Sequence, residues 1–325
     1  MEFDKPFYTY EQQILLLKEE KKLQVDDIAH AVRLLKRYGY FSLIGGYKKP
    51  FKRKNKEYKP HTTINDIHKL YMFDTDLRAL FLRYILFIES HIKSLISYAF
   101  CAEFGASESA FLSANNYNYS VKNQNGINRL ISKLSDTLED KDNHYPYIKH
   151  QKTQHGNVPL WVLMKALTFG VVSSMYNYLP QNIKQNVSRE FEYVNEGMLS
   201  QMLDFLSRVR NVCAHNERLF DYRYKKGSID DTNAHKQLSI PCNNNGFYKK
   251  GKNDLLAVII IFYYLLPEED FKSFADSFQG LINEYLNSQN IIVKLQLYRY
   301  MGLSNNWYDL VSDNVHVLER NHETA

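Results

Sequence analysis

Cysteine, glycine and proline are all scarce in this chain of 325 residues, which holds 3, 13 and 8 of them respectively. The cysteines Cys101, Cys213 and Cys242 form no Cys-x-x-Cys pair, so neither a zinc site nor a disulfide framework is indicated. Folds rich in tight β-turns need more glycine and proline than this. The composition favours long helices, and we predict an all-α fold.

Long hydrophobic runs are also missing, and we expect no secretory leader. The longest apolar run, Leu255 to Leu266, is about 12 residues long, whereas a helix needs about 20 residues to span a bilayer. The N-terminus reads Met-Glu-Phe-Asp-Lys and has neither the basic nor the apolar region of a secretory signal. We therefore expect a soluble protein of a reducing cytoplasm, with no membrane partner.

Charge is nearly balanced over the whole chain, at a formal +5, but cations are concentrated in residues 47–60, which we call the basic strip. Most such runs are solvated loops. The alternative is a strip that contacts phosphates, in which the interleaved aromatic rings of Tyr47, Phe51 and Tyr58 stack on unpaired bases. The candidate RNA-binding residues of the strip are Lys48, Lys49, Lys52, Arg53 and Lys54.

Apolar residues recur at three- and four-residue steps over most of the chain, which is the period of amphipathic helices. This pattern predicts helices over residues 9–21, 25–38, 63–103, 127–138, 159–179, 182–192, 196–216, 253–265, 267–285 and 289–300. The third of these is long enough for two helices or one kinked helix. Residues 38–47 are predicted as an irregular loop or small hairpin, 140–157 as a polar connection and 221–252 as a long polar excursion.

These elements suggest three parts. They are an N-terminal helical region with the basic strip (1–60), a helical domain that includes the excursion (61–300) and a C-terminal tail (301–325).

The residues suited to chemistry gather in one segment, Arg208-Val-Arg-Asn-Val-Cys-Ala-His-Asn-Glu-Arg218. An arginine followed four to six residues later by a histidine is expected about once by chance in such a chain, so the surrounding helix must support the assignment. At about 100° per residue, this helix has an apolar stripe opposite a polar one. The apolar stripe holds Leu199, Met202, Leu203, Leu206, Val209 and Cys213, and the polar stripe holds Asp204, Arg208, Asn211, His215 and Arg218. An ordinary solvated face in a chain rich in lysine and glutamate would show those residues instead.

Arg210 projects onto the edge of the apolar stripe. An unpaired buried charge there would cost several kcal/mol, so this arginine needs an acidic partner. Glu89, which lies within an otherwise apolar helix, is the first candidate, and Asp74 and Asp76 are the next. Such a bridge can be purely structural, or it can fix a catalytic arginine in place.

These residue types suit cleavage of RNA without a metal or an organic cofactor. His215 can act as base or acid near neutral pH, and an arginine offers a planar fork of donors to phosphate oxygens. Asn211, one helical turn before His215, can orient the imidazole ring or bind phosphate. One histidine supplies only one of the two proton transfers, so we expect a symmetric homodimer that brings two copies of the motif together.

The segment Arg210-Asn-x-x-x-His215, at the end of a helix, resembles the Arg-Asn-x-x-x-His signature of the HEPN-superfamily ribonucleases. Further blocks, in order over roughly residues 8–285, resemble the Abi-like group, the AbiD and AbiF type of abortive-infection protein. They are Tyr10-Glu-Gln-Gln-Ile-x-Leu-Leu17, Tyr38-x-x-Phe41 with Gly46-Tyr47, Phe73-Asp-x-x-Leu-Arg78 followed by Ile88-Glu89, Pro159-Leu-Trp161 with Leu167-Thr-Phe-Gly170, and Arg210-Asn-x-Cys-Ala-His-Asn-x-Arg-Leu219.

This resemblance implies a bacterial antiphage or toxin-type endoribonuclease with a HEPN-type helical bundle, commonly dimeric. Some AbiF-like members are associated with a small structured RNA that restrains them. The resemblance carries over Arg210 and His215 as catalytic residues, Asn211 as the polar motif residue, and Asn216 and Arg218 as supporting residues. The alternative function is that of a non-catalytic RNA-binding helical module.

The family pattern and plain helix geometry select different arginines. The pattern selects Arg210, whereas Arg208 lies nearly in line with His215 across two helical turns. We take Arg210 as the catalytic residue, on the assumption that the helix ends or bends near Ala214, and Arg208 as a phosphate contact.

Overall fold

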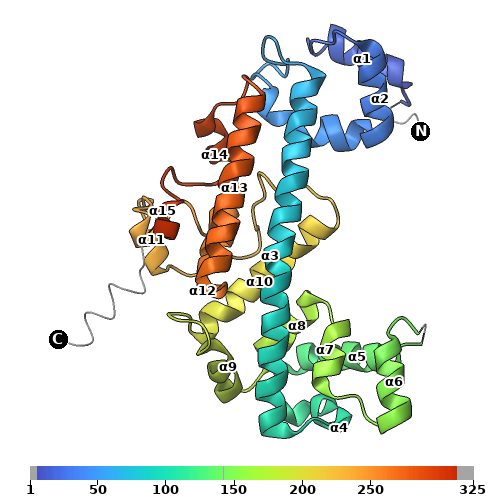
Figure 1. Cartoon of the computed structure of the whole chain (residues 1–325), viewed down its shortest axis with the longest axis vertical. Coiled ribbons are helices and arrows are strands. Elements are labelled where there is room, and N and C mark those ends of the chain that lie inside the picture. The colour runs from blue at the N-terminus through green and yellow to red at the C-terminus, as the bar shows by residue number, and fades with distance from the viewer. Residues whose placement is uncertain (1–5, 142, 313–325) are drawn as a thin grey trace, which may run out of the picture.

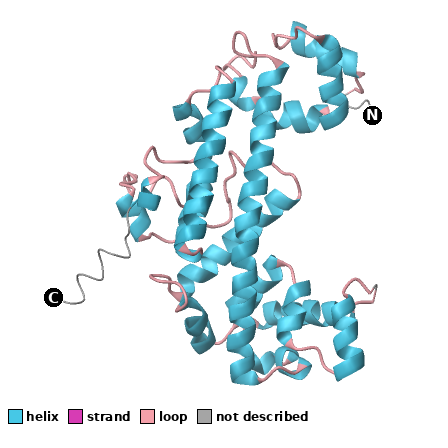
Figure 2. Cartoon of the chain, in the orientation of Figure 1, coloured by secondary structure: helices cyan, strands magenta, loops and turns pink. Residues whose placement is uncertain are grey.

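The computed structural model describes residues 6–141 and 143–312, and every regular element within them is a helix (Figure 2). The predicted all-α fold is confirmed. The α-helices are α1 (Tyr10–Glu19), α2 (Ile28–Tyr38), α3 (Ile64–Phe104), α4 (Glu108–Leu112), α5 (Gln124–Glu139), α6 (Pro146–His155), α7 (Leu160–Ala166), α8 (Phe169–Tyr178), α9 (Gln181–Ser188), α10 (Glu196–Ala214), α11 (Asn233–Gln237), α12 (Leu255–Leu265), α13 (Glu268–Ser288), α14 (Lys294–Met301) and α15 (Asp309–Ser312).

The 41-residue helix α3 is the spine of the molecule. It begins at a capping box, in which the Thr63 hydroxyl accepts the N–H of Asp66 and the Asp66 carboxylate accepts the N–H of Thr63. It ends at Gly105, whose φ of 84° favours glycine. No glycine or proline interrupts residues 64–104, so the stretch forms one helix where the sequence allowed two.

The other helices are arranged along this spine (Figure 1). Helices α1 and α2 lie at one end of α3 and helices α4–α8 at the other, while α13 runs beside it and α10 crosses it near its middle. Phe81 of α3 packs against Phe274 and Phe278 of α13, with ring centroids 5.1 and 5.5 Å apart. By length and hydropathy alone α3 could cross a membrane, but that is weak evidence, because the core helix of a soluble protein passes the same test.

Four stretches differ from the sequence prediction, and three of them lie after residue 139. Residues 140–157, predicted as a polar connection, contain helix α6, which begins at Pro146 and ends before Gly156 with its φ of 65°. The single helix predicted over 159–179 is two helices, α7 and α8, because Leu167 and Thr168 adopt extended backbone between them. In the predicted tail, residues 302–312 pack onto the core: Trp307 is 1% exposed, and its ring lies 5.0 Å from that of Phe278. The rest of that tail, 313–325, lies outside the described residues.

The turn after α2 is helical rather than a hairpin. A π-helical segment, η1 (Phe41–Gly45), and a 3₁₀ turn, η2 (Lys49–Phe51), precede a single antiparallel bridge between Lys52 and Tyr58. Residues 221–252 form an ordered excursion that returns to the start of α12. Its centre is His235, whose ring is fully buried between Thr232 and the carbonyl of Gly251.

Candidate active site

Helix α10 buries one stripe and exposes the other. The predicted apolar stripe, from Leu199 to Cys213, is buried throughout. Arg208, Asn211 and His215 of the polar stripe are exposed at the surface. The helix therefore presents an amide and an imidazole to solvent one turn apart, as the sequence predicts.

The helix ends at Ala214, the position that the choice of Arg210 assumed. His215 is the C-cap residue, and Asn216 follows in the left-handed conformation with φ 57°. The N–H of Glu217 then donates to the carbonyl of Val212 at 3.0 Å, which closes a Schellman-type helix end. Asparagine tolerates this conformation better than most residues. The motif histidine consequently lies at an exposed helix terminus with a defined backbone.

Two buried side chains of α3 hold the chain that leaves α10. The Asp74 carboxylate, fully buried, accepts the N–H of Leu219 at 3.1 Å and that of Phe220 at 2.6 Å. The Arg78 guanidinium pairs with Asp74 at 2.6 Å. It also donates to the Asn216 side-chain oxygen at 2.6 Å and to the Glu217 carbonyl at 3.4 Å. The residues after His215 are thereby fixed to the spine.

The start of the basic strip joins the same network. The Tyr47 hydroxyl donates to Asp74 at 2.6 Å and accepts from Arg78 at 3.1 Å, and we call Tyr47, Asp74 and Arg78 the buried clamp. Burial, followed by the charge of Asp74, raises the pKa of Tyr47 above its ordinary value. Arg218 donates to the Gly46 carbonyl and, through Nε, to the Asp221 carboxylate at 2.5 Å. The loop before the strip and the loop after the motif are therefore tied together.

None of the three clamp residues was predicted as a site residue from the sequence. Asp74 was a second candidate partner for Arg210, and Tyr47, Asp74 and Arg78 belong to the blocks that resemble the Abi-like group. The sequence signal that could have revealed the clamp is the pair Asp74 and Arg78, four residues apart on one helix and directly preceded by the apolar residues Phe73 and Leu77. Such a pair on a buried face must be matched with each other and with further polar groups.

Arg210 faces the spine, and its partner is Glu89. Arg210 Nε lies 3.8 Å from Glu89 Oε2, while Lys93 holds the other carboxylate oxygen at 2.7 Å. Among the residues that the structure describes, none forms a hydrogen bond with Arg210 Nε or Glu89 Oε2, so the two groups attract each other by charge at longer range. The Arg210 side chain remains 31% exposed, which leaves part of the guanidinium open to a ligand.

Arg208 has a different environment. It is 52% exposed and pairs with Asp204 of its own helix at 3.4 Å. Asp204 also accepts the Tyr224 hydroxyl of the excursion. In the described part of the chain, neither arginine forms a hydrogen bond with the side chain of His215, which is exposed.

Cysteine chemistry does not fit the motif. Cys213 lies within it but is buried, and burial raises the pKa of its thiol to about 12, so the nucleophilic thiolate is absent at neutral pH. Among residues 6–141 and 143–312, no three or more His, Cys, Asp or Glu side chains group in a way that could hold a metal ion.

The basic strip keeps four of its five candidate cations at the surface. Those four are Lys48, Lys49, Arg53 and Lys54. Lys52 instead donates to the Lys56 carbonyl at 2.5 Å and lies 3.7 Å from the centre of the Tyr58 ring. The stacking role proposed for the strip's aromatic residues is wrong, because all three are core residues: Tyr47 (3% exposed), Phe51 (0%) and Tyr58 (3%).

The part of the chain that holds these features matches a known protein family. A search of the curated proteins and a search of the solved structures found no match. The family model described as Abi-like protein matches residues 33–221. That range is more than half of the chain and contains the motif, Glu89 and the buried clamp. The chain belongs to the Abi-like protein family.

Proposed function

We propose that this chain is a metal-independent endoribonuclease of the HEPN type that acts in bacterial abortive infection. The observation that carries the proposal is the end of α10. An exposed histidine and amide lie there at the end of the helix that also carries Arg208 and Arg210, and buried charges of α3 hold the following residues in place. Membership of the Abi-like family supports the biological role.

The chemistry is an internal transfer at phosphorus. His215 removes the proton of a 2′-hydroxyl, and the resulting 2′-oxygen attacks the adjacent phosphorus. The bond from phosphorus to the 5′-oxygen breaks, and that oxygen takes a proton from a second acid. Arginine donors stabilise the charge that develops on the phosphate oxygens. The products are a 2′,3′-cyclic phosphate and a 5′-hydroxyl.

A second copy of the chain supplies the second proton-transfer group. Within one chain the motif holds a single histidine, so a homodimer that opposes two helix ends completes the acid–base pair. Leu86 of α3 is 43% exposed and precedes Glu89 by three residues, which is about 60° around the helix, so it offers the dimer an apolar side chain on the flank of α3 that bears Glu89. Replacing Leu86 with Glu should abolish dimerisation and cleavage together, whereas the same change at Leu295 on α14 should alter neither.

The deciding experiment replaces His215 with Ala. We expect cleavage of RNA and toxicity to the cell to disappear while the fold and RNA affinity are retained. The matched control is His150→Ala, at an exposed histidine on α6 at the far end of α3. A His215→Ala variant that cleaves as well as the parent would refute the enzyme and leave an RNA-binding module. Cyclic phosphate ends on the product are the expected chemical signature.

The same cleavage assay distinguishes the roles of Arg208 and Arg210. Arg210→Ala leaves Glu89 paired with Lys93, and Arg208→Ala leaves Asp204 with the Tyr224 hydroxyl, so neither change strands a buried charge. We expect Arg210→Ala to abolish cleavage and Arg208→Ala to weaken RNA binding. The opposite result would make Arg208 the catalytic arginine.

RNA binding through the basic strip is tested by salt dependence. Neutralising Lys48, Lys49, Arg53 and Lys54 together should reduce the slope of log affinity against log salt by about one for each phosphate that these side chains neutralise in the parent. An unchanged slope would show that the strip is a solvated loop. Purification from the native host would show whether a small structured RNA accompanies the protein, as the family resemblance suggests.

A further inference from the structure

The N-terminal helices carry a pocket lined by aromatic rings, which lies between the start of α1 and the turn after α2. Its lining residues are Pro6, Phe7, Tyr8, Gln13, Leu16, Tyr40 and Phe41, around a cavity of about 510 Å³. Phe7 and Phe41 are 89% and 88% exposed. Large aromatic side chains exposed together around one hollow are typical of a binding surface.

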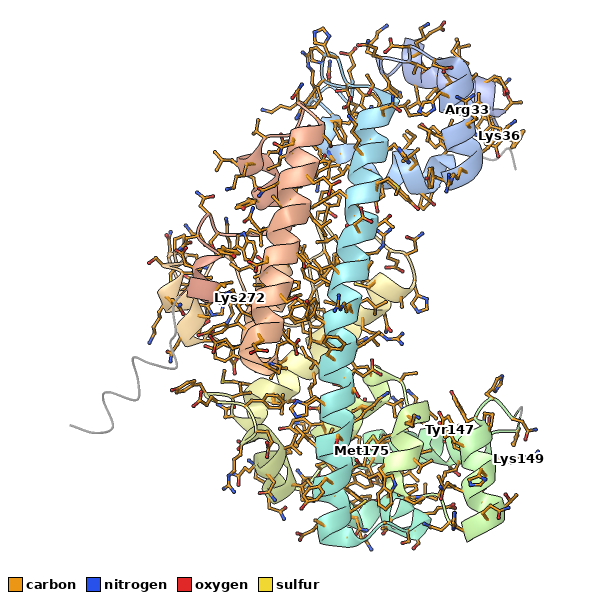
Figure 3. The ribbon with its side chains drawn as sticks, viewed as in Figure 1. Arg33, Lys36, Tyr147, Lys149, Met175 and Lys272 are labelled. Atoms are coloured by element: carbon orange, nitrogen blue, oxygen red, sulfur yellow. The ribbon has the colours of Figure 1, made fainter. Side chains whose placement is uncertain are left out.

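Two cations of α2 lie over aromatic rings that are two residues along the chain from the pocket lining: Tyr10 follows the lining residue Tyr8, and Tyr38 precedes the lining residue Tyr40. Lys36 Nζ lies 5.8 Å from the centre of the Tyr10 ring, and the Arg37 guanidinium lies 5.4 Å from that of Tyr38. Figure 3 shows Lys36, with Arg33, on the outer side of the N-terminal helices. Two acids lie on this side, Glu11 near Lys36 and Asp27 at 3.9 Å from Arg33.

A second group of cations lies on the side of the basic strip. The backbone carbonyl of Lys21 accepts the N–H of Tyr58 at 2.9 Å, and Lys52 covers the ring of Tyr58. Burial, together with the charges of Lys48 and Lys21, lowers the pKa of Lys52 to about 8. The nearby acids are Glu57 and Glu20, the latter 3.5 Å from Lys21. Lysine charges that act on one another in this way favour an anion beside them.

The pocket is also connected to the motif. Phe41 is the first residue of η1, and Gly46, directly after η1, accepts a hydrogen bond from Arg218. The five-residue helix η1 therefore spans from the aromatic pocket to the loop that follows His215. Lys48 and Lys49, two and three residues after Gly46, are exposed and can contact a polymer that continues from the pocket.

We propose that this pocket binds an unpaired base of single-stranded RNA, stacked on Phe7 and Phe41, with the neighbouring phosphates contacted by Lys36 and Lys48. Exposed rings between cations suit this ligand, because every base offers a π-face and the backbone needs positive charge. A duplex keeps its bases stacked on one another and cannot use the rings. The inference rests on the proposed function only in taking RNA as the polymer.

The test measures affinity rather than cleavage, in the His215→Ala background so that RNA stays intact. Phe7→Ala and Phe41→Ala should each weaken binding of a single-stranded oligouridylate about tenfold and leave binding of a duplex of equal length unchanged. Phe247→Ala removes a ring that is 61% exposed in the excursion and should change neither. Circular dichroism should show the fold intact, because both mutated rings contribute little buried surface.

The charges are tested separately. Lys36→Ala should lower the salt slope of single-strand binding by about one. Lys149→Ala and Lys272→Ala remove equal charge from α6 and α13, well away from Lys36 in Figure 3, and should leave the slope unchanged. An equal slope change for Lys36 and the two control lysines would overturn the phosphate contact.

Two further results would overturn the inference. One is single-strand affinity unchanged in the Phe7→Ala/Phe41→Ala double variant. The other is a parent protein that is dimeric in sedimentation and becomes monomeric in that variant, which would assign the pocket to self-association. If the parent chain cleaves RNA while the variants bind as tightly as before, the inference fails and the enzyme stands. If the parent never cleaves but its pocket binds single strands, the enzyme fails and the inference stands.

Discussion

Replacing Asp74 with Asn tests whether the buried clamp holds the motif. The change keeps the side-chain volume but removes the charge that faces Arg78, whose guanidinium is 4% exposed. Removing one partner of a buried ion pair costs about 3–5 kcal/mol, because the remaining charge is left uncompensated. The new amide group must also face the Tyr47 hydroxyl and the N–H groups of Leu219 and Phe220, which all require an acceptor.

The destabilisation should be visible in thermal unfolding. At about 2.1 cal/mol/K of unfolding entropy per residue, a decrease of about 4 kcal/mol in unfolding free energy lowers Tm by roughly 6 °C for 325 residues. The matched control is Asp76→Asn, since Asp76 lies on the same helix but is exposed. We expect that variant to stay within about 0.5 kcal/mol of the parent.

A double variant separates stability from positioning. In Asp74→Asn/Arg78→Met no buried charge remains, so most of the stability should return. The Asn216 side chain then loses the hydrogen bond that it accepts from Arg78. Because Asn216 is exposed, water replaces that donor. We expect RNA cleavage to stay low in this stable variant, with the decrease in kcat rather than in RNA affinity.

Two results would refute this reasoning. One is an Asp74→Asn variant less than about 1 kcal/mol less stable than the parent, because a broken buried pair must cost more. The other is a double variant that regains both stability and full cleavage, which would make the clamp a purely structural device.

Three further predictions concern single residues. Glu89→Gln should reduce cleavage about tenfold by releasing Arg210 and cost about 3 kcal/mol, because it breaks a pair in which the Glu89 and Lys93 side chains are only 8% and 15% exposed; unchanged activity would show that Arg210 needs no orientation. Asn216→Ala should be about 1 kcal/mol less stable than Asn216→Gly, because φ is 57° there; the reverse order in urea unfolding would contradict this. Burial lowers the pKa of His235, so its contribution to stability should be full above about pH 6.5 and should disappear as the pH falls through the lower folded value. Hydrogen exchange of residues 221–252 at pH 7 and pH 5 should show this change in the parent and not in His235→Gln.

The helices themselves follow from the sequence. Their periodicity, the capping residues and the scarcity of glycine and proline place α3, α10 and α13 nearly where the structure has them, because these signals are local. The same holds for the buried and exposed stripes of α10. The prediction failed where local signals were weak. Helix α6 is short and polar, so it has no apolar periodicity, and the two extended residues between α7 and α8 are too few to interrupt a periodic pattern.

The arrangement around the motif was decided by tertiary structure. The sequence marks Arg210 as needing an acid, and the choice of Glu89 over Asp74 depends on which turns of α3 the crossing helix α10 meets. The buried clamp links Tyr47 to Asp74 and, through Arg78, to Asn216. These residues are far apart in the chain, so no spacing rule reveals the contact. The aromatic residues of the basic strip looked available for stacking, yet they fill the core, while Phe7 and Phe41 remain exposed. Residue type sets what a ring can bind, and only packing determines which rings reach the surface.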